Sequence, residues 1–316
     1  MHAIFKISFL SISICCSAQL GFSAERLELP MAKSNILSRS SQNYVTLQSD
    51  TSISFPSYSD PRAYYTKQIS KFSTASSSDL KAYLKSLLNL AHIRNEGDYD
   101  TLADDCSNEP NSCVPVMSYD YESARKLLFG SIHLTEQQGS FAIEPLYCGN
   151  KVLHKSIGVL QIPYGSGLNC EHIWPKSRFD QPKNSGPYKL MLSDLHHLYP
   201  AYATVNSTRG SNRFGVPSKP HKISGCSNNM EGPGDYGHLF YPRQEVRGDI
   251  ARATFYFSIR YGLEIDDREE QTLREWNALD PVSSFEVHKN NLVYRSQGNR
   301  NPFIDLPGLS NYIDNF

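Results

Sequence analysis

Apolar residues recur three and four positions apart in several parts of the chain, which is the spacing of an amphipathic helix. The first such run follows Ser76 and Asp79, which resemble an N-terminal capping box with Asp in place of Glu. It predicts a helix from Leu80 that ends near 95–97. The same spacing predicts three further helices, over residues 121–129, 245–261 and 267–279.

Other stretches lack this spacing. Residues 151–163 are β-branched and partly alternating, which predicts strands. Gly and Pro recur through 215–237, which predicts a loop, and the tail after Asp280 is largely polar until 302–304. There is no internal repeat. The pattern predicts an α+β fold, a mainly helical single domain with a small antiparallel sheet around the chemistry.

Composition limits the possible classes. The chain has 316 residues, of which 39% are hydrophobic and 11% aromatic, enough for a sizeable buried core. Its formal net charge is −1, which excludes a generally polycationic nucleic-acid binder. Any attraction for polyanions must therefore be local.

The N-terminal residues 1–24 have the features of a secretory signal. Lys6 precedes an apolar run over 7–16, and small residues at 16–18 and 23–24 offer cleavage sites after Ala18 or Ala24. A retained apolar anchor or a lipid-modified Cys15 or Cys16 are the alternatives.

Residues 25–60 are polar and Ser-rich, and we expect a flexible, partly disordered lead-in before a body over 61–316. No later segment is long and apolar enough to cross a membrane. We expect a secreted or periplasmic monomer with no stable membrane association.

Five cysteines remain once Cys15 and Cys16 are removed with the signal. Cys106 and Cys113 bracket a short polar loop and are the easiest pair to join by a disulfide. The other three, at 148, 170 and 226, allow one more bond and leave one thiol over. The sequence does not choose among them.

The candidate chemistry lies in the centre of the chain, in blocks that read NCEHIWP at 169–175, SDLHHLYP at 193–200 and VNSTRG at 205–210. They contain a carboxylate, imidazoles, an amide and a guanidinium. Such groups supply an oxygen ligand for a hard cation, a base for water and a donor for phosphate. This is the set that a metal-assisted phosphodiester hydrolase needs.

Glu171 and His172 are adjacent, so on a strand they would point to opposite faces. For both to serve one site, the strand must twist or end there, and Asn206 must return in space. A β-hairpin followed by a helix would achieve this, with His172 at the end of the first strand and Asn206 in the first turn of the helix.

The same segment is locally basic. Residues 171–222 contain eight Lys and Arg against three Asp and Glu, a formal charge of +5. Release of counterions from a phosphate backbone would favour binding there. For any one of these lysines, a solvated basic face is an equally good interpretation.

These blocks resemble the bacterial endonuclease I family. The likeness continues in RGDIARA at 247–253, in QGNRNPF at 297–303 and in Tyr64-Tyr65, so it covers 61–316. The resemblance implies a secreted or periplasmic nonspecific nuclease built around an embedded His-Me (ββα-metal) finger. Its substrate would be DNA, with RNA as a further candidate, and its products would carry 5′-phosphates.

The resemblance also implies roles for individual residues. His172 would be the general base, and Glu171 and Asn206 would hold one Mg²⁺, with Ca²⁺ or Mn²⁺ as substitutes. Arg209 would act in catalysis as a phosphate clamp. Asp194, His196 and His197 would brace the loop near the site.

Further cations are candidates for phosphate binding: Arg213, Lys176, Lys183 and Lys189. Some family members carry a phosphate-binding arginine in a longer insertion between the first two blocks. Here residues 180–190 are short and offer only the last two of these lysines. Which cation contacts the scissile phosphate stays open.

Two other functions remain possible from the residues. One is a nonenzymatic binding module stabilised by zinc, with ligands drawn from Cys170, His172, His196, His197 and Cys226. The other is a secreted metal-dependent phosphodiesterase for small substrates. Hydrolysis of plasmid DNA would distinguish the endonuclease from both.

Overall fold

The computed structural model describes residues 61–95, 97–109 and 111–316. The predictions of a signal over 1–24 and of a lead-in over 25–60 therefore lie outside the described residues. None of the helices in the described part of the chain has the length and apolar composition needed to cross a bilayer.

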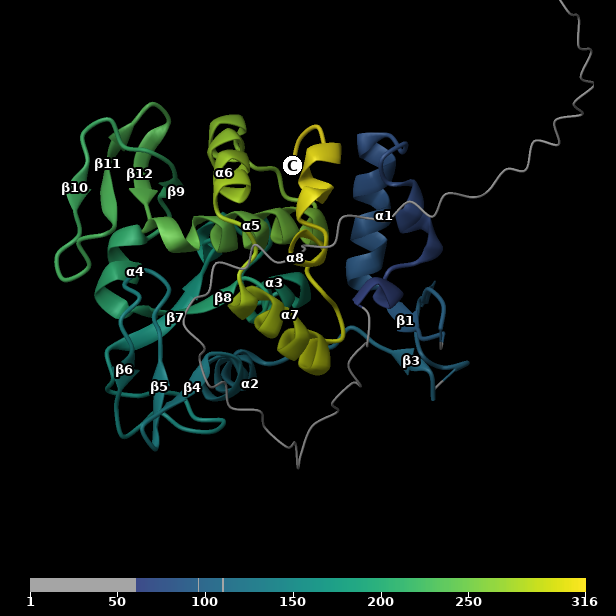
Figure 1. Cartoon of the computed structure of the whole chain (residues 1–316), viewed down its shortest axis with the longest axis horizontal. Helices are drawn as coiled ribbons and strands as arrows, with labels where there is room; N and C mark the ends of the chain where they lie inside the picture. Colours follow the sequence, from purple (N-terminus) through teal and green to yellow (C-terminus); the bar gives the residue numbers. More distant parts are fainter. Residues whose placement is uncertain (1–60, 96, 110) are drawn as a thin grey trace, which may run out of the picture.

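Helix α5 (Arg247–Tyr261) occupies the centre of the fold, and other helices pack around it (Figure 1). All its residues from Gly248 to Arg260 are buried. Helix α5 contacts helices on several sides: α1 (Ser77–Asn89), α6 (Asp267–Leu279) and α8 (Pro302–Asp305). A helix buried all round cannot show a clean apolar stripe, and its charged side chains must find partners inside the protein.

The predicted helices are present, but some of them end at other residues than predicted. Helix α6 has the predicted bounds, and the region 245–261 starts with a short 3₁₀ turn before α5. Helix α1 begins after Ser76, whose hydroxyl accepts a hydrogen bond from the backbone of Asp79. The predicted end near 95–97 is wrong, because α1 stops at Asn89 and the chain turns into a strand.

Helix α2 (Tyr121–Leu127) also ends earlier than predicted, because the chain widens into a π-helical turn over Leu128–Ile132. Helices α3 (Gly186–Ser193) and α4 (Ala203–Arg209) flank the second strand of the central hairpin.

The strands form several small sheets rather than the single small sheet predicted. The first has the order β2-β1-β3, from β1 (Ala91–Ile93), β2 (Thr101–Ala103) and β3 (Cys113–Val114). The second has the order β4-β5-β6, from β4 (Leu134–Gln137), β5 (Ser140–Ile143) and β6 (Val152–Leu153). Of the strands predicted over 151–163, only β6 forms.

A larger sheet has the order β10-β11-β12-β9, from β9 (Arg213–Phe214), β10 (His221–Lys222), β11 (Met230–Gly234) and β12 (Gly237–Tyr241). Strand β9 is parallel to β12, and the other pairs are antiparallel. The prediction of a loop throughout 215–237 is therefore wrong, since β10 and β11 lie within this range. Gly232 in β11 has a positive φ of 156°, and a side chain there would meet the carbonyl oxygen of Lys219 at 2.3 Å.

Helix α7 (Ser284–Gln297) was not predicted. It starts with a full capping box between Ser283 and Glu286. Its buried face includes Glu286, Lys289, Asn290 and Gln297, so apolar periodicity is weak. These side chains are satisfied by a buried polar network instead, in which Arg252 binds both carboxylate oxygens of Glu286 at 2.6 and 2.8 Å.

The hairpin of β7 (Leu168–His172) and β8 (Leu198–Tyr202) lies between two hydrophobic clusters. Tyr199 and Ala201 belong to the large cluster that includes α5. Cys170 and Leu198 belong to a smaller cluster with α2, β4 and β5. Since side chains alternate along a strand, each face of the hairpin is fixed by a different core.

The described part of the chain contains two disulfides. Cys106–Cys113 confirms the predicted pair, and Cys148–Cys226 is the second bond that the three other cysteines allowed. Cys170 is a free, buried thiol.

Gly130 allows the close approach of two segments, and Gly130→Ala is expected to destabilise the fold. A methyl group there would lie 2.2 Å from the backbone nitrogen of Leu160, which itself donates a hydrogen bond to Gly130. The backbone must shift, at a cost of about 2 kcal/mol in the free energy of unfolding, measured by urea denaturation. Gly186→Ala, with nothing within 4 Å of its added carbon, is the matched control. Equal stability of the two variants would contradict the prediction.

Candidate functional site

The central blocks form two antiparallel strands followed directly by a helix. In the β7–β8 ladder, Glu171 pairs with Tyr199 and His172 with Leu198. Helix α4 follows β8 without a loop and carries Asn206 in its first turn. This is the predicted hairpin and helix, with His172 as the last residue of β7. We call residues 168–209 the ββα unit.

The ββα unit has a groove of about 420 Å³ on its surface. Glu171, His172, Asn206 and Arg209 all line it, with Asn169 and Lys176 beside them. The end of β7 at His172 lets two adjacent side chains reach the same groove. The predicted spatial convergence of carboxylate, imidazole and amide is therefore present.

Glu171 is buried and fixed through one carboxylate oxygen. The hydroxyl of Tyr147 donates to Oε1 at 2.7 Å, and Nη1 of Arg209 lies 3.3 Å from the same atom. No side chain described in the structure donates a hydrogen bond to Oε2. Burial raises the pKa of the Glu171 carboxyl, and the Arg209 guanidinium opposes that rise.

His172 is held by its Nε2 atom, which lies 3.1 Å from the carbonyl oxygen of Leu192 in α3. Since a carbonyl only accepts, Nε2 carries the proton, and Nδ1 of the neutral ring is the basic atom. Burial lowers the pKa of His172 well below its usual range, and His197 and Lys176 lower it further. The imidazole is therefore neutral at neutral pH, with Nδ1 unprotonated.

Asn206 is oriented by its amide nitrogen. Nδ2 donates to Oδ1 of Asn169 at 2.7 Å and to the carbonyl of Cys170 at 3.2 Å. This leaves Oδ1 of Asn206 as the acceptor atom, in a groove that Glu171 also lines. A carboxylate oxygen and an amide oxygen are hard donors, the type that Mg²⁺, Ca²⁺ and Mn²⁺ prefer, so these residues fit the expected cation.

Arg209 is almost fully buried beneath Glu171 and β7. Its guanidinium donates to the carbonyl of His172 at 3.1 Å and to that of Ile173 at 2.6 Å, and it packs over the ring of Phe214. These contacts point inward and brace the end of β7. They favour a positioning role for Arg209, while its phosphate-clamp role stays a prediction.

The other predicted cations differ in position. Lys176 is exposed and lines the groove. Arg213 pairs with Glu269 at 3.4 Å and with Asp266 at 3.8 Å. Lys183 and Lys189 are exposed but do not line the groove. Of this predicted set, the structure thus brings only Lys176 to the groove with its side chain open to solvent.

Asp194 and the two following histidines tie the unit to the rest of the fold. The Asp194 carboxylate accepts hydrogen bonds from Tyr256, Tyr261 and Gln297 and pairs with Arg260 at 2.5 Å. Burial alone would raise the pKa of Asp194, but the Arg260 guanidinium and the hydrogen bond from Gln297 hold it well below its usual range.

The histidine rings are also fixed from outside the hairpin. Nε2 of His196 lies 3.1 Å from the carbonyl of Asn299, and Nε2 of His197 lies 2.8 Å from that of Met191. Burial lowers the pKa of His196 to about 3 and that of His197 to about 4. Both rings are neutral and serve as donors to the backbone.

The zinc-site alternative does not fit this structure. Cys226 is consumed by its disulfide with Cys148, and the rings of His196 and His197 bind backbone carbonyls. Over residues 61–95, 97–109 and 111–316, no group of three or more His, Cys, Asp or Glu side chains is arranged to hold a metal ion.

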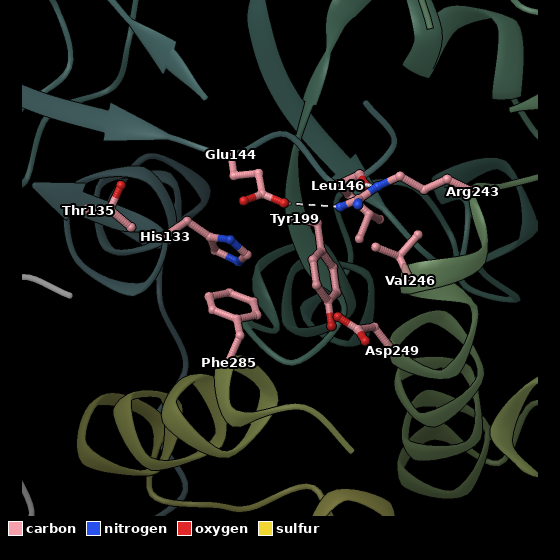
Figure 2. A pocket seen from close by; sticks show the side chains of 9 residues that line it. All are labelled: His133, Thr135, Glu144, Leu146, Tyr199, Arg243, Val246, Asp249 and Phe285. Carbon is pink, nitrogen blue, oxygen red and sulfur yellow. Dashed lines mark hydrogen bonds and ion pairs between the residues drawn. The ribbon is translucent and has the colours of Figure 1, made fainter. Parts of the chain in front are cut away.

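A separate cavity lies behind the hairpin, lined by side chains that include His133, Glu144, Tyr199, Arg243 and Asp249 (Figure 2). The carboxylate of Glu144 pairs with Arg243 at 3.2 Å across one side of it. Its volume of about 30 Å³ suits one or two water molecules and is far too small for a nucleotide. The groove of the ββα unit is therefore the better candidate for substrate.

Comparison with known proteins agrees with this geometry. The family model described as Endonuclease I matches residues 76–308, which include the whole ββα unit and the α5 and α7 segments that brace it. The chain belongs to the endonuclease I family. The family resemblance of the central blocks is thereby confirmed.

Several characterised nucleases are similar to this chain. An extracellular ribonuclease of Bacillus subtilis (strain 168) is 37% identical over 165 residues, covering 46% of this chain and 53% of the relative. A periplasmic deoxyribonuclease of Aeromonas hydrophila is 29% identical over 143 residues, covering 45% and 58%. An extracellular deoxyribonuclease of Aeromonas hydrophila is 30% identical over 158 residues, covering 46% and 68%.

The chain thus spans about half the length of the ribonuclease that it matches. The names of these relatives support the predicted secreted or periplasmic location.

Sequence reasoning missed two residues of this candidate site. Tyr147 orients the Glu171 carboxylate, and Asn169 orients the Asn206 amide. Asn169 was quoted in the first block but given no role. Tyr147 lies beside Cys148, and no spacing connects it to Glu171. A contact of this kind becomes visible only when the chain is folded.

Lys289 of α7 provides a pH-dependent prediction. Its ammonium is buried, donates to the carbonyls of His196 and Leu198 and lies 3.2 Å from the centre of the Tyr199 ring. Burial lowers its pKa to about 7, although Asp249 and Glu286 oppose the change. Between this value and the usual value near 10.5, the unfolded chain binds the extra proton.

Stability therefore rises with pH across that window. Relative to Lys289→Met, the wild-type free energy of unfolding is expected to gain about 2 kcal/mol between about pH 6 and about pH 9, measured by urea denaturation. Lys67→Met, at an exposed position, is the control and should show no such gain. A constant difference between wild type and Lys289→Met would refute the shifted pKa.

Proposed function

We propose that this chain is a secreted or periplasmic endonuclease that hydrolyses phosphodiester bonds of DNA, and of RNA as a second substrate, with the aid of one divalent cation. The observation that carries the proposal is the convergence of Glu171, His172 and Asn206 on one groove of the ββα unit. The names of the relatives, which include both deoxyribonucleases and a ribonuclease, support the substrate class. We interpret the ββα unit as a His-Me finger.

Each residue of the proposed active site has its own role. His172 takes a proton from the attacking water at Nδ1, because its Nε2 is committed to the Leu192 carbonyl. Oε2 of Glu171 and Oδ1 of Asn206 would hold Mg²⁺, with Ca²⁺ or Mn²⁺ as substitutes. When bound, such a cation neutralises charge on the phosphate and on the departing oxygen.

Tyr147, Arg209 and Asn169 keep these donor atoms in place, and Arg209, which also lines the groove, stays the candidate phosphate clamp. Preorganisation of this kind means that little rearrangement is needed during the reaction. Lys176, exposed at the groove, is suited to bind the nucleic-acid backbone. Because such contacts go to phosphate rather than base edges, sequence specificity should be low. Release of the 3′-oxygen would leave 5′-phosphate ends.

Replacement of the base should separate catalysis from binding. His172→Ala is expected to lower the rate of plasmid cutting by about 100-fold or more, since it removes proton transfer. Binding of a fluorescent DNA duplex, measured by anisotropy, should stay within about twofold, because the cations of the groove remain. His221→Ala, at an exposed histidine outside the groove, is the control. Loss of binding equal to the loss of rate would reject the base role.

Replacement of the carboxylate should change the dependence on metal. Glu171→Gln keeps the shape of the side chain and an acceptor for Tyr147 but removes the charge. The Mg²⁺ concentration for half-maximal rate is expected to rise about 10-fold or more, since the charge of the ligand set controls affinity. Calorimetric titration of the protein with Mg²⁺ alone should show the same change. Glu264→Gln, at an exposed position, is the control, and an unchanged Mg²⁺ titration would reject Glu171 as a ligand.

The substrate class has its own test. The purified protein should cut supercoiled plasmid in Mg²⁺ and lose this activity in EDTA. Hydrolysis of bis(p-nitrophenyl) phosphate with no cutting of plasmid or RNA would favour the phosphodiesterase for small substrates instead.

A further inference from the structure

An exposed aromatic ring stands directly before the first strand of the ββα unit. The side chain of Tyr164 is 67% exposed, although it is a large and largely apolar group. It belongs to the turn over 163–167, which leads into β7 at Leu168. A ring in this position contributes little to the core and is available to a partner.

The turn that carries Tyr164 is held by several hydrogen bonds. The Ser166 hydroxyl donates to the carbonyl of Pro163 at 2.6 Å and accepts from the backbone of Leu168 at 3.2 Å. The carbonyl of Gly167 accepts from the backbone of Ala203 at the start of α4. The ring is therefore presented from a turn that is fixed to the start of β7 and to the start of α4 in the ββα unit.

A guanidinium from another element lies beside this ring. The Arg125 guanidinium, from α2, lies 5.8 Å from the centre of the Tyr164 ring and 5.6 Å from that of Tyr121. Its side chain makes no hydrogen bond or ion pair with any residue in the described ranges. The next residue, Lys126, differs in this respect, because it pairs with Glu122 at 2.8 Å.

Arg125 and Tyr164 lie close to the proposed active site. Tyr121, one helical turn before Arg125, places its ring centre 5.7 Å from that of His172. The Arg125 guanidinium lies 5.6 Å from the centre of this same Tyr121 ring, so a single ring separates it from His172, which lines the groove.

We propose that Tyr164 and Arg125 form a binding subsite for single-stranded nucleic acid next to the groove. The Tyr164 ring stacks on an unpaired base, and the Arg125 guanidinium binds the adjacent phosphate. Aromatic rings accept any base, and a guanidinium matches the geometry of phosphate oxygens. The subsite rests on the proposed nuclease function and gives that function a preference for unpaired strands.

A purely internal role explains the arrangement less well. Both ring-to-guanidinium distances are near the outer limit of about 6 Å for cation–π attraction, so the contact adds little stability. A pair that served only the fold would also not need a ring that is two-thirds exposed.

Steady-state kinetics on a fluorescent single-stranded DNA oligonucleotide test the proposal. Tyr164→Ala is expected to raise KM about 10-fold with a small change in kcat, and Tyr164→Phe, which keeps the ring, should stay near wild type. Arg125→Ala should raise KM. It should also reduce the slope of log KM against log salt concentration by about one, the change expected for the loss of one phosphate contact. A blunt-ended duplex should show a smaller effect of Tyr164→Ala than the single strand.

Matched controls separate the subsite from the fold and from the chemistry. Lys126→Ala, on the same helix, and Tyr312→Ala, at an exposed tyrosine near the C-terminus, should leave KM unchanged. Hydrolysis of bis(p-nitrophenyl) phosphate, which has no neighbouring nucleotide, should be the same in Tyr164→Ala and wild type.

The outcomes distinguish this proposal from the one on which it rests. Cleavage by the wild type with an unchanged KM in Tyr164→Ala would overturn the subsite and leave the nuclease function intact. An equal loss on duplex and single strand, or a matching loss on bis(p-nitrophenyl) phosphate, would also overturn it. A folded wild type that cuts neither DNA nor RNA would overturn the nuclease function, and the subsite with it.

Discussion

The buried carboxylate of Asp194 is the interaction on which the rest of the site depends. It collects hydroxyl, guanidinium and amide donors from α5 and α7, while its own backbone belongs to the loop before β8. Removal of one member of such a network leaves the others buried without partners, which costs more than the pair itself contributes. The loop that leads into β8 of the ββα unit is therefore fixed by polar contacts deep in the protein.

A second set of contacts orients the side chains that are proposed to react. Each proposed reactive side chain is held through the atom that it does not need: His172 through Nε2, Asn206 through Nδ2 and Glu171 through Oε1. The remaining atoms are the ones suited to accept a proton or bind a cation. Orientation by neighbours of this kind is what gives metal sites in proteins their geometry. The proposed reactive side chains are therefore oriented toward one groove although they come from separate elements.

The sequence predicted those parts whose signal is local. Helix α6 followed from its apolar spacing, and the convergence of Glu171, His172 and Asn206 followed from motif residues on a strand and a helix. Helix α7 was not predicted, because its buried face is polar and the periodicity of apolar residues does not indicate it. The role of Tyr147 was not predicted, because its contact with Glu171 exists only in the folded chain. Sequence reasoning also could not tell that Arg209 is buried.

The disulfide Cys148–Cys226 has a topological consequence. Its two ends are 78 positions apart in the sequence, and the segment between them contains β7, α3, β8 and α4, so a covalent ring encloses the entire ββα unit. In the chain-entropy account, closing a ring of this size lowers the conformational entropy of the unfolded chain, which stabilises the fold by about 4 to 5 kcal/mol. One end of the ring is next to Tyr147, whose hydroxyl holds Glu171. Full stability of the ββα unit is thereby coupled to thiol oxidation, a step available outside the cytoplasm.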